Sequence, residues 1–247
     1  MAKYAGSDVG ILLIDGYDLR PYAQELAEDG ISAVLEDTSV FGDTWEAKDY
    51  TGIKLGGGFN LKGFLDGAAL ASIAALITNE GVSRVCAYGV EGNTLGKRVV
   101  CMGAALEQGS GRMVPLKAFQ KISAKFAASG IVDTEALVHT PLGALSGASG
   151  DGTAVDNAAS SANGGRGYFF VKALTLGGYT NLALKVRHSA DDITYADKAT
   201  ATVVTAAPTG ELVTVTGTVN RYTRSNWAYN GAGAGQSATA MIAFARG

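Results

Sequence analysis

The chain has 247 residues, which is enough for one large domain or two modest ones. Hydrophobic residues make up 47% of it, so a substantial core can be buried, and 34 glycines against 4 prolines suit many tight turns between strands. The formal net charge is −3, divided into −7 for residues 1–165 (12 basic, 19 acidic) and +4 for residues 166–247 (8 basic, 4 acidic). No basic cluster interleaved with aromatic residues occurs, which argues against sequence-specific recognition of nucleic acid.

The N-terminal segment, residues 1–8, lacks the apolar core of a signal peptide. The longest apolar run, Gly67–Ile77, is too short to span a bilayer. We therefore expect a protein that folds in a cytosol and has no membrane anchor. Its two cysteines, Cys86 and Cys101, should stay reduced there.

The first elements are expected to be short strands. Val9–Ile14 is an apolar strand, and Asp15-Gly16 begins a turn after it. Tyr22–Glu28 and Ile31–Asp37 then predict a hairpin around Asp29-Gly30, because an Asx-Gly pair is a strong turn signal.

A loop, a strand and a helix follow. Ser39–Gly52 is polar and aromatic without periodicity, which predicts a loop, and large apolar anchors of its kind are enriched at protein interfaces; these aromatics could equally fold back onto their own core. Ile53–Leu65 alternates with period two, which predicts a strand with one covered face. Asp66 can cap a short helix, Asp66–Thr78, whose thin, mostly alanine polar face permits close packing.

Val82–Val90 and Arg98–Leu106 predict a hairpin around Glu91–Lys97. A turn centred on its middle residues would place Cys86 directly opposite Cys101. Cysteines in that position form a disulfide only with strain, so both are expected to be free, small, buried residues.

Val114–Ala128 is ambiguous between helix and strand. Its three lysines share a face under either period, and Pro115 would suit the first turn of a helix. Pro141–Gly165 has no aromatic, lysine or arginine residue, which predicts a linker or long surface loop. Its glycines lack the G-K-[ST] of a phosphate loop, and its acidic residues lack the spacing of a calcium loop.

Residues 166–247 predict a second all-β unit in the form of a small β-sandwich. Leu182, Leu184 and Val186 alternate with polar or small neighbours, as in a half-buried strand. The six expected strands are Tyr168–Leu176, Leu182–Ser189, Lys198–Val204, Glu211–Thr218, Tyr222–Tyr229 and Ser237–Ala245.

Catalytic chemistry is not indicated. The two histidines are His139, ahead of the expected linker, and His188, at a strand end beside Ser189 and Asp191. Neighbours on one strand point to opposite faces, so this set cannot form a catalytic triad, and we expect His188 to be a structural donor. No metal-binding spacing or nucleophile elbow occurs, so we expect no enzyme, no metal and no cofactor.

The order of these elements carries a resemblance. A short strand, a G-Y-D-L turn (Gly16–Leu19), F-G-D-T (Phe41–Thr44), a glycine-punctuated strand and a helix resemble the major tail tube protein of long non-contractile-tailed bacteriophages, over roughly Val9–Val132. The segments His188–Tyr195, Asn220–Tyr222 and Phe244–Arg246 resemble a C-terminal β-domain found in tail and virion proteins of actinobacteriophages. Relatives often have Trp at the position of Tyr195. Arg221 and Arg246 are expected to be core-edge arginines paired with a carboxylate or carbonyl.

The resemblance implies a mainly β fold. It consists of a tail-tube-type β-sandwich or barrel with one short packing helix (residues 1–140), the linker (141–165) and a C-terminal β-sandwich (166–247). It favours a strand for Val114–Ala128, with Leu116, Ile122 and Phe126 on the face opposite the lysines.

The resemblance also implies a function. The chain would assemble in the host cytoplasm into hexameric rings that stack as the tail tube of the virion, with tape measure and tail terminator or tip proteins as partners. DNA would pass through without specific binding, and an acidic N-terminal part suits such a conduit, although ordinary solubilising charge explains it equally well. The expected contact loop between subunits contains Phe41, Asp43, Thr44, Trp45 and Tyr50.

Two alternatives remain open at this point. A carbohydrate-binding or adhesion module would be a monomer with exposed aromatics lining a groove. The tube protein of a contractile tail, or of a tail-derived particle, would share the fold and differ in its sheath partner.

Overall fold

The computed structural model describes residues 9–37, 48–64, 81–89, 91–113 and 120–247, with side chains apart from those of 29–37, 48–56 and 112–113. The fold is mainly β with antiparallel sheets, and no helix occurs in the described ranges. The expected helix Asp66–Thr78 lies outside them. The strands are β1 (Ile11–Ile14), β2 (Tyr17–Asp18), β3 (Ala23–Asp37), β4 (Lys48–Phe64), β5 (Ser83–Gly89), β6 (Arg98–Met113), β7 (Lys121–Ala128), β8 (Val132–Ala144), β9 (Ser149–Asp151), β10 (Val155–Asp156), β11 (Gly165–Thr175), β12 (Asn181–Ser189), β13 (Ala196–Thr200), β14 (Thr209–Val215), β15 (Tyr222–Asn230) and β16 (Ser237–Arg246).

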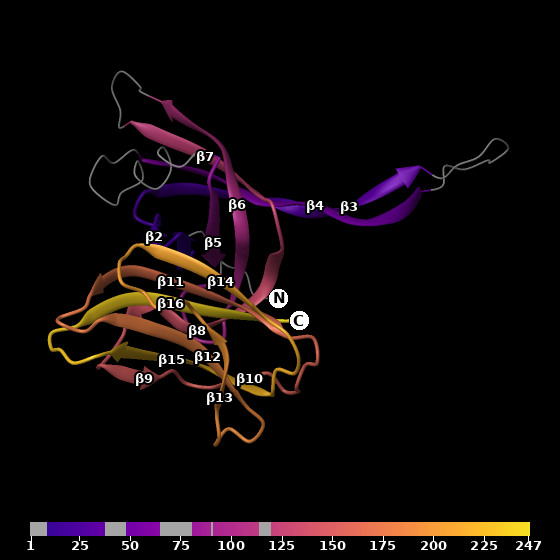
Figure 1. Ribbon diagram of the computed structural model, residues 1–247. Helices are drawn as coiled ribbons and strands as arrows, with labels where there is room; N and C mark the ends of the chain where they lie inside the picture. The colour runs from indigo at the N-terminus through magenta and orange to yellow at the C-terminus, as the bar shows by residue number, and fades with distance from the viewer. Residues whose placement is uncertain (1–8, 38–47, 65–80, 90, 114–119) are drawn as a thin grey trace.

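An eleven-stranded sheet connects the two ends of the chain (Figure 1). Its order is β14-β11-β16-β8-β6-β5-β1-β2, and β7, β4 and β3 branch from β6. The sheet curls until β14 contacts β5. Leu212 of β14 also packs against Gly103 of β6, where a Cβ would collide with its side chain.

The curled sheet encloses a central core to which both expected domains contribute. Tyr168 and Phe170 of β11 are fully buried in it together with Ile11 and Leu13 of β1. The N-terminal and C-terminal parts therefore share apolar packing. The members of this core are Ile11, Leu13, Ala87, Val99, Cys101, Ala136, Val138, Leu142, Tyr168, Phe170, Met241, Ala243 and Ala245.

Two further cores lie on either side of the central one. Above it in Figure 1, β4 and β7 pack against β1, β5 and β6 around the stacked rings of Phe59 and Phe126. Below it, β11 and β16 pack against a second sheet of order β10-β15-β12-β13, to which β9 adds through β15. All six strands expected in the C-terminal part are present with shifted ends.

The hairpin expected around Asp29-Gly30 is wrong. β3 runs through both residues as one continuous strand and pairs along its length with β4. Gly30 lies opposite the glycine run Gly56–Gly58, so these glycines sit inside a ribbon instead of closing a turn. Of the expected loop Ser39–Gly52, residues 48–52 belong to β4, which begins at Lys48, and the rest lies outside the described residues.

The predicted pairing of the cysteines is wrong by one position. Cys86 lies opposite Met102 and Cys101 opposite Ala87, because the β5–β6 pairing is centred on Thr94 and not between Asn93 and Thr94. The two thiols consequently face different cores. Both are free and buried, as predicted, and burial raises their pKa well above the usual value.

The strand interpretation of Val114–Ala128 is confirmed where the structure describes it. In β7, Ile122 and Phe126 are buried while Lys121 and Lys125 are exposed. Leu116 lies outside the described residues. The segment 141–165, expected as a linker or surface loop, contains the end of β8 and two short strands, β9 and β10, that pair with β15.

Candidate assembly surface

The β3–β4 hairpin projects from the body of the molecule as an arm (Figure 1). Near its root, β4 also pairs with β7, from Gly58 to Phe64. Beyond that point Ile31–Asp37 pairs with Lys48–Gly56 alone within the described residues. The seven residues of Ile31–Asp37 give this part a reach of about 23 Å at ~3.3 Å per residue. A two-stranded ribbon is marginal in water, so the arm is a candidate for contact with a partner.

Four of the five predicted contact residues, Phe41, Asp43, Thr44 and Trp45, fall outside the described residues. Tyr50 belongs to β4, where its backbone lies opposite Leu35 next to a register shift. The contact role of these five residues therefore stays a prediction.

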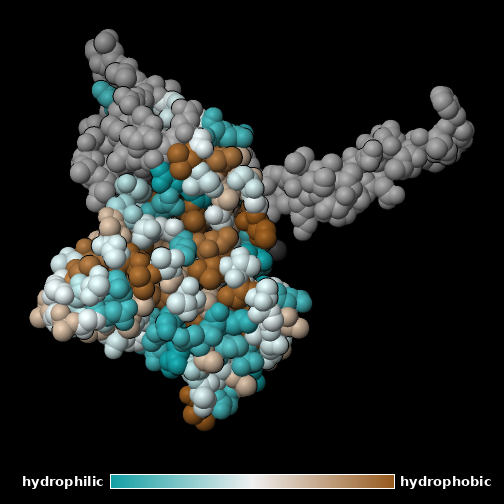
Figure 2. Space-filling view, in the orientation of Figure 1, coloured by the Kyte–Doolittle hydropathy of each residue, from teal (hydrophilic) through white to brown (hydrophobic). Residues whose placement is uncertain are grey.

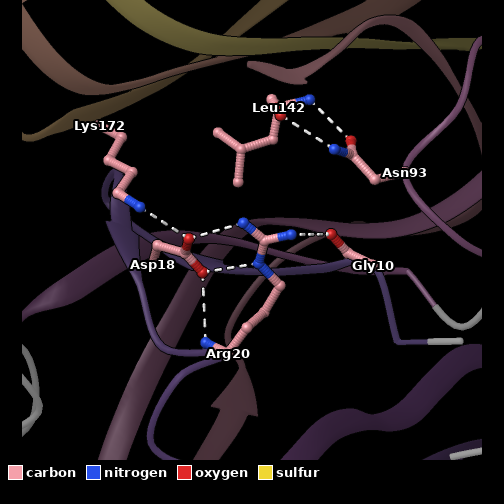
Figure 3. Close-up of polar contacts among 6 residues, drawn as sticks. All are labelled: Gly10, Asp18, Arg20, Asn93, Leu142 and Lys172. Atoms are coloured by element: carbon pink, nitrogen blue, oxygen red, sulfur yellow. Dashed lines mark hydrogen bonds and ion pairs between the residues drawn. The ribbon is translucent and has the colours of Figure 1, made fainter. Parts of the chain in front are cut away.

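A polar cluster that sequence reasoning missed fixes the root of the arm (Figure 3). The Arg20 guanidinium donates to both carboxylate oxygens of Asp18, at 2.8 and 2.7 Å, and to the Gly10 carbonyl at 2.7 Å. Lys172 of β11 donates to the same carboxylate at 2.9 Å. Burial raises the pKa of Asp18, but these hydrogen bonds outweigh it and hold that pKa below the usual value. The segment that leads into β3 is thereby tied to β11 in the C-terminal part of the chain.

A second contact in Figure 3 holds the β5–β6 connection against β8. The Asn93 amide accepts from Leu142 N at 2.7 Å and donates to Leu142 O at 2.9 Å, as a neighbouring strand would. At the other end of β5, Asp15 accepts from the Arg84 guanidinium at 2.6 Å and from Val85 N at 2.8 Å. Residues so distant in sequence give no local signal by which these pairs could have been found.

The outward face of β4 and β7 is basic. Lys62, Lys121 and Lys125 are exposed there, and the register places Lys62 opposite Ser123 on β7, between the two β7 lysines. Lys62 pairs with Glu25 of β3 at 2.9 Å. A shallow hollow of about 380 Å³ lies on this face.

Apolar surface is also exposed on the face of the molecule that Figure 2 presents. Figure 2 shows brown surface over the middle of the view, between the upper strands and the C-terminal sandwich. The large apolar side chains exposed among the described residues are Val82, Ile131, Ile193 and Val203. None of these four is aromatic.

The outer face of the C-terminal sheet is a network of paired charges. Arg187 lies between Asp151 and Asp197, at 3.6 and 3.2 Å, and Arg224 pairs with Asp151 at 2.9 Å. The Arg224 guanidinium covers the Tyr195 ring at 3.8 Å, so the ring has a packing role. With its charges satisfied internally, this face offers little for an ionic ligand.

The expected pairing of Arg221 and Arg246 with a carboxylate or a carbonyl is confirmed. Arg221 makes a bidentate pair with Asp156, at 2.7 and 2.6 Å. Arg246 donates to the carbonyls of Asn157 and Ala159, at 3.3 and 2.6 Å.

Both histidines are engaged in structural hydrogen bonds. His139 is 2% exposed, and its Nε2 lies 2.7 Å from Thr223 Oγ1 on β15. His188 Nδ1 accepts from Asn220 N at 3.0 Å, so it is an acceptor where a donor was expected. The Ser189 hydroxyl donates to Asp191 and not to His188.

Among the described residues, no group of three or more His, Cys, Asp or Glu side chains could hold a metal ion. No helix in the same ranges has the length and apolar character needed to cross a lipid bilayer. Comparison of the sequence with known protein families gives no match. Comparison with curated proteins gives no match either.

Proposed function

We propose that this chain is a structural protein of a bacteriophage tail that assembles with copies of itself into stacked hexameric rings, the tube through which DNA is ejected. The single observation that carries the proposal is the projecting arm. A ribbon that reaches about 23 Å past its last neighbouring strand within the described residues gains little stability alone. Pairing or packing against identical subunits would cover it.

Two further features support self-assembly. Within the described residues β3 pairs only with β4, and exposed strand edges are normally protected or paired. A closed ring of identical copies protects such edges without a cap, and head-to-tail stacking then extends the assembly. The net charge of −7 on residues 1–165 fits a conduit that DNA passes without adhering.

The test is the mass of the purified chain by size-exclusion chromatography with light scattering over a hundredfold range of concentration. The proposal expects species at six times the 25.2 kDa monomer, or larger multiples of it, that grow with concentration. A 25.2 kDa monomer at every concentration would contradict it.

A further inference from the structure

We propose that the basic outward face of β4 and β7 is the surface that receives the β3–β4 arm of a second copy. The contact would be held by ion pairs between lysines of this face and carboxylates of the arm. The inference rests on the proposed self-assembly and adds to it the place at which two copies meet.

The receiving face is defined by side chains on two neighbouring strands. Lys121, Ser123 and Lys125 of β7 are exposed, and Lys62 of β4 projects beside Ser123. The hollow on this face is lined by Lys62 with its partner Glu25, by Lys125, and by small residues, among them Gly109. Small residues let an extended backbone approach closely, while the long lysine side chains can bend toward its carboxylates.

The arm carries the complementary charge. Residues 31–56, the part of the arm beyond its pairing with β7, contain five acidic and two basic residues, a net charge of −3. The backbone register places Glu36 opposite Asp49 and Asp37 opposite Lys48, so acidic residues occupy three of these four neighbouring positions. A cationic surface would suit this acidic part of the arm.

The sequence around β7 has the opposite character. Residues 108–132 contain four basic residues and no acidic one, a net charge of +4 within an otherwise acidic N-terminal part. Every copy therefore supplies one acidic arm and one basic face. Each copy can insert its arm into the face of one neighbour and receive the arm of another neighbour. This head-to-tail arrangement is the type of interface that closes rings or extends filaments.

The test uses two charge-reversed variants. The face variant, Lys62→Glu/Lys121→Glu, keeps the acidic arm and replaces two of the three lysines of the face with acidic residues. The arm variant, Glu36→Lys/Asp49→Lys, has a more basic arm and the natural basic face. Exposed ion pairs are individually weak, so we expect each variant alone to need a roughly tenfold higher concentration to assemble. An equimolar mixture should recover wild-type assembly, because each arm then meets a face of opposite charge.

A matched control, Lys97→Glu/Lys198→Glu, makes the same change in net charge away from this face and should assemble as the wild type does. Raising the ionic strength should weaken assembly of the wild type. Thermal unfolding of each variant verifies that it is folded.

Each remaining outcome decides the matter. Wild-type chain that stays monomeric overturns the proposed function and this inference together. Wild-type assembly that the face variant leaves unchanged overturns only the inference. Weakened assembly that the mixture does not rescue excludes the arm as the occupant of the face. Retention of duplex DNA that is lost in the face variant, with assembly unchanged, would identify a nucleic-acid backbone as the occupant instead.

Discussion

Protonation of His139 should destabilise the folded protein at mildly acidic pH. The ring is 2% exposed and lies between the large sheet and the C-terminal sheet. Its Nδ1 faces the Leu137 carbonyl at 2.9 Å and therefore donates, which leaves Nε2 to accept from the Thr223 hydroxyl. That hydroxyl oxygen already accepts from Asn157 Nδ2 at 2.9 Å. A proton on Nε2 would require this hydroxyl to turn its hydrogen away from the ring, and it would place a positive charge in a buried site.

The direction and size of the change in stability with pH follow from the pKa of His139 in the unfolded and in the folded chain. Burial lowers the pKa of His139 from 6.5 to about 4 in the folded protein. Between these values the unfolded chain binds a proton that the folded chain does not, so stability falls as the pH falls through this window. The loss is ~1.4 kcal/mol per pH unit, which gives about 2 kcal/mol between pH 7.5 and pH 5. Above pH 6.5 the contribution is constant.

The assay is urea unfolding followed by tryptophan fluorescence at pH 7.5 and pH 5, for wild type and for His139→Gln. Trp227 is 8% exposed and should report on loss of the C-terminal core. The variant should lose about 2 kcal/mol less than wild type between the two pH values. The pKa of His188 is lowered by its burial and by Lys198, but this histidine is present in both proteins and cancels. Equal losses in the two proteins would refute the reasoning.

Three other predictions concern the shared core and the root of the arm. Asp133→Asn removes the carboxylate that Arg166 contacts at 2.6 Å through two nitrogens, and should cost ~3 kcal/mol in urea unfolding. Gly16→Ala should lower the melting temperature more than Gly96→Ala. Both glycines have positive φ, but only at Gly16 would a Cβ collide with the backbone of β11. Equal effects of the two substitutions would count against close packing at Gly16. Deleting residues 166–247 removes Tyr168, Phe170 and Met241 from the central core, so the remaining chain should be protease-sensitive and lack a cooperative melt; a stable fragment would contradict the shared core.

The sequence predicts the C-terminal part of this fold well, because its strands are short and alternate locally. Leu182, Leu184 and Val186 are all fully buried, as their spacing indicates. The failure at Asp29-Gly30 has a physical cause. An Asx-Gly pair is compatible with a tight turn, but a long alternating partner strand can pair straight through it, and only tertiary context decides between the two.

The root of the arm could not be predicted, since its contacts join residues far apart in the chain. Asp18 and Lys172 are 154 positions apart, and neither belongs to a recognisable motif. The central core poses the same difficulty. Local patterns suggested two separate units, whereas the burial of Tyr168 beside Ile11 depends on how the sheet curls. Of the candidate contact residues, only the backbone of Tyr50 falls in the described part, so its contact role remains to be tested.

Negative-stain electron microscopy of the purified full chain tests the central claim most directly. The claim is that identical copies cover the projecting arm and the free edge of β3. The account predicts six-fold rings or tubes of uniform diameter at high protein concentration. A field of small isolated particles at that concentration, from protein shown to be folded, would contradict it.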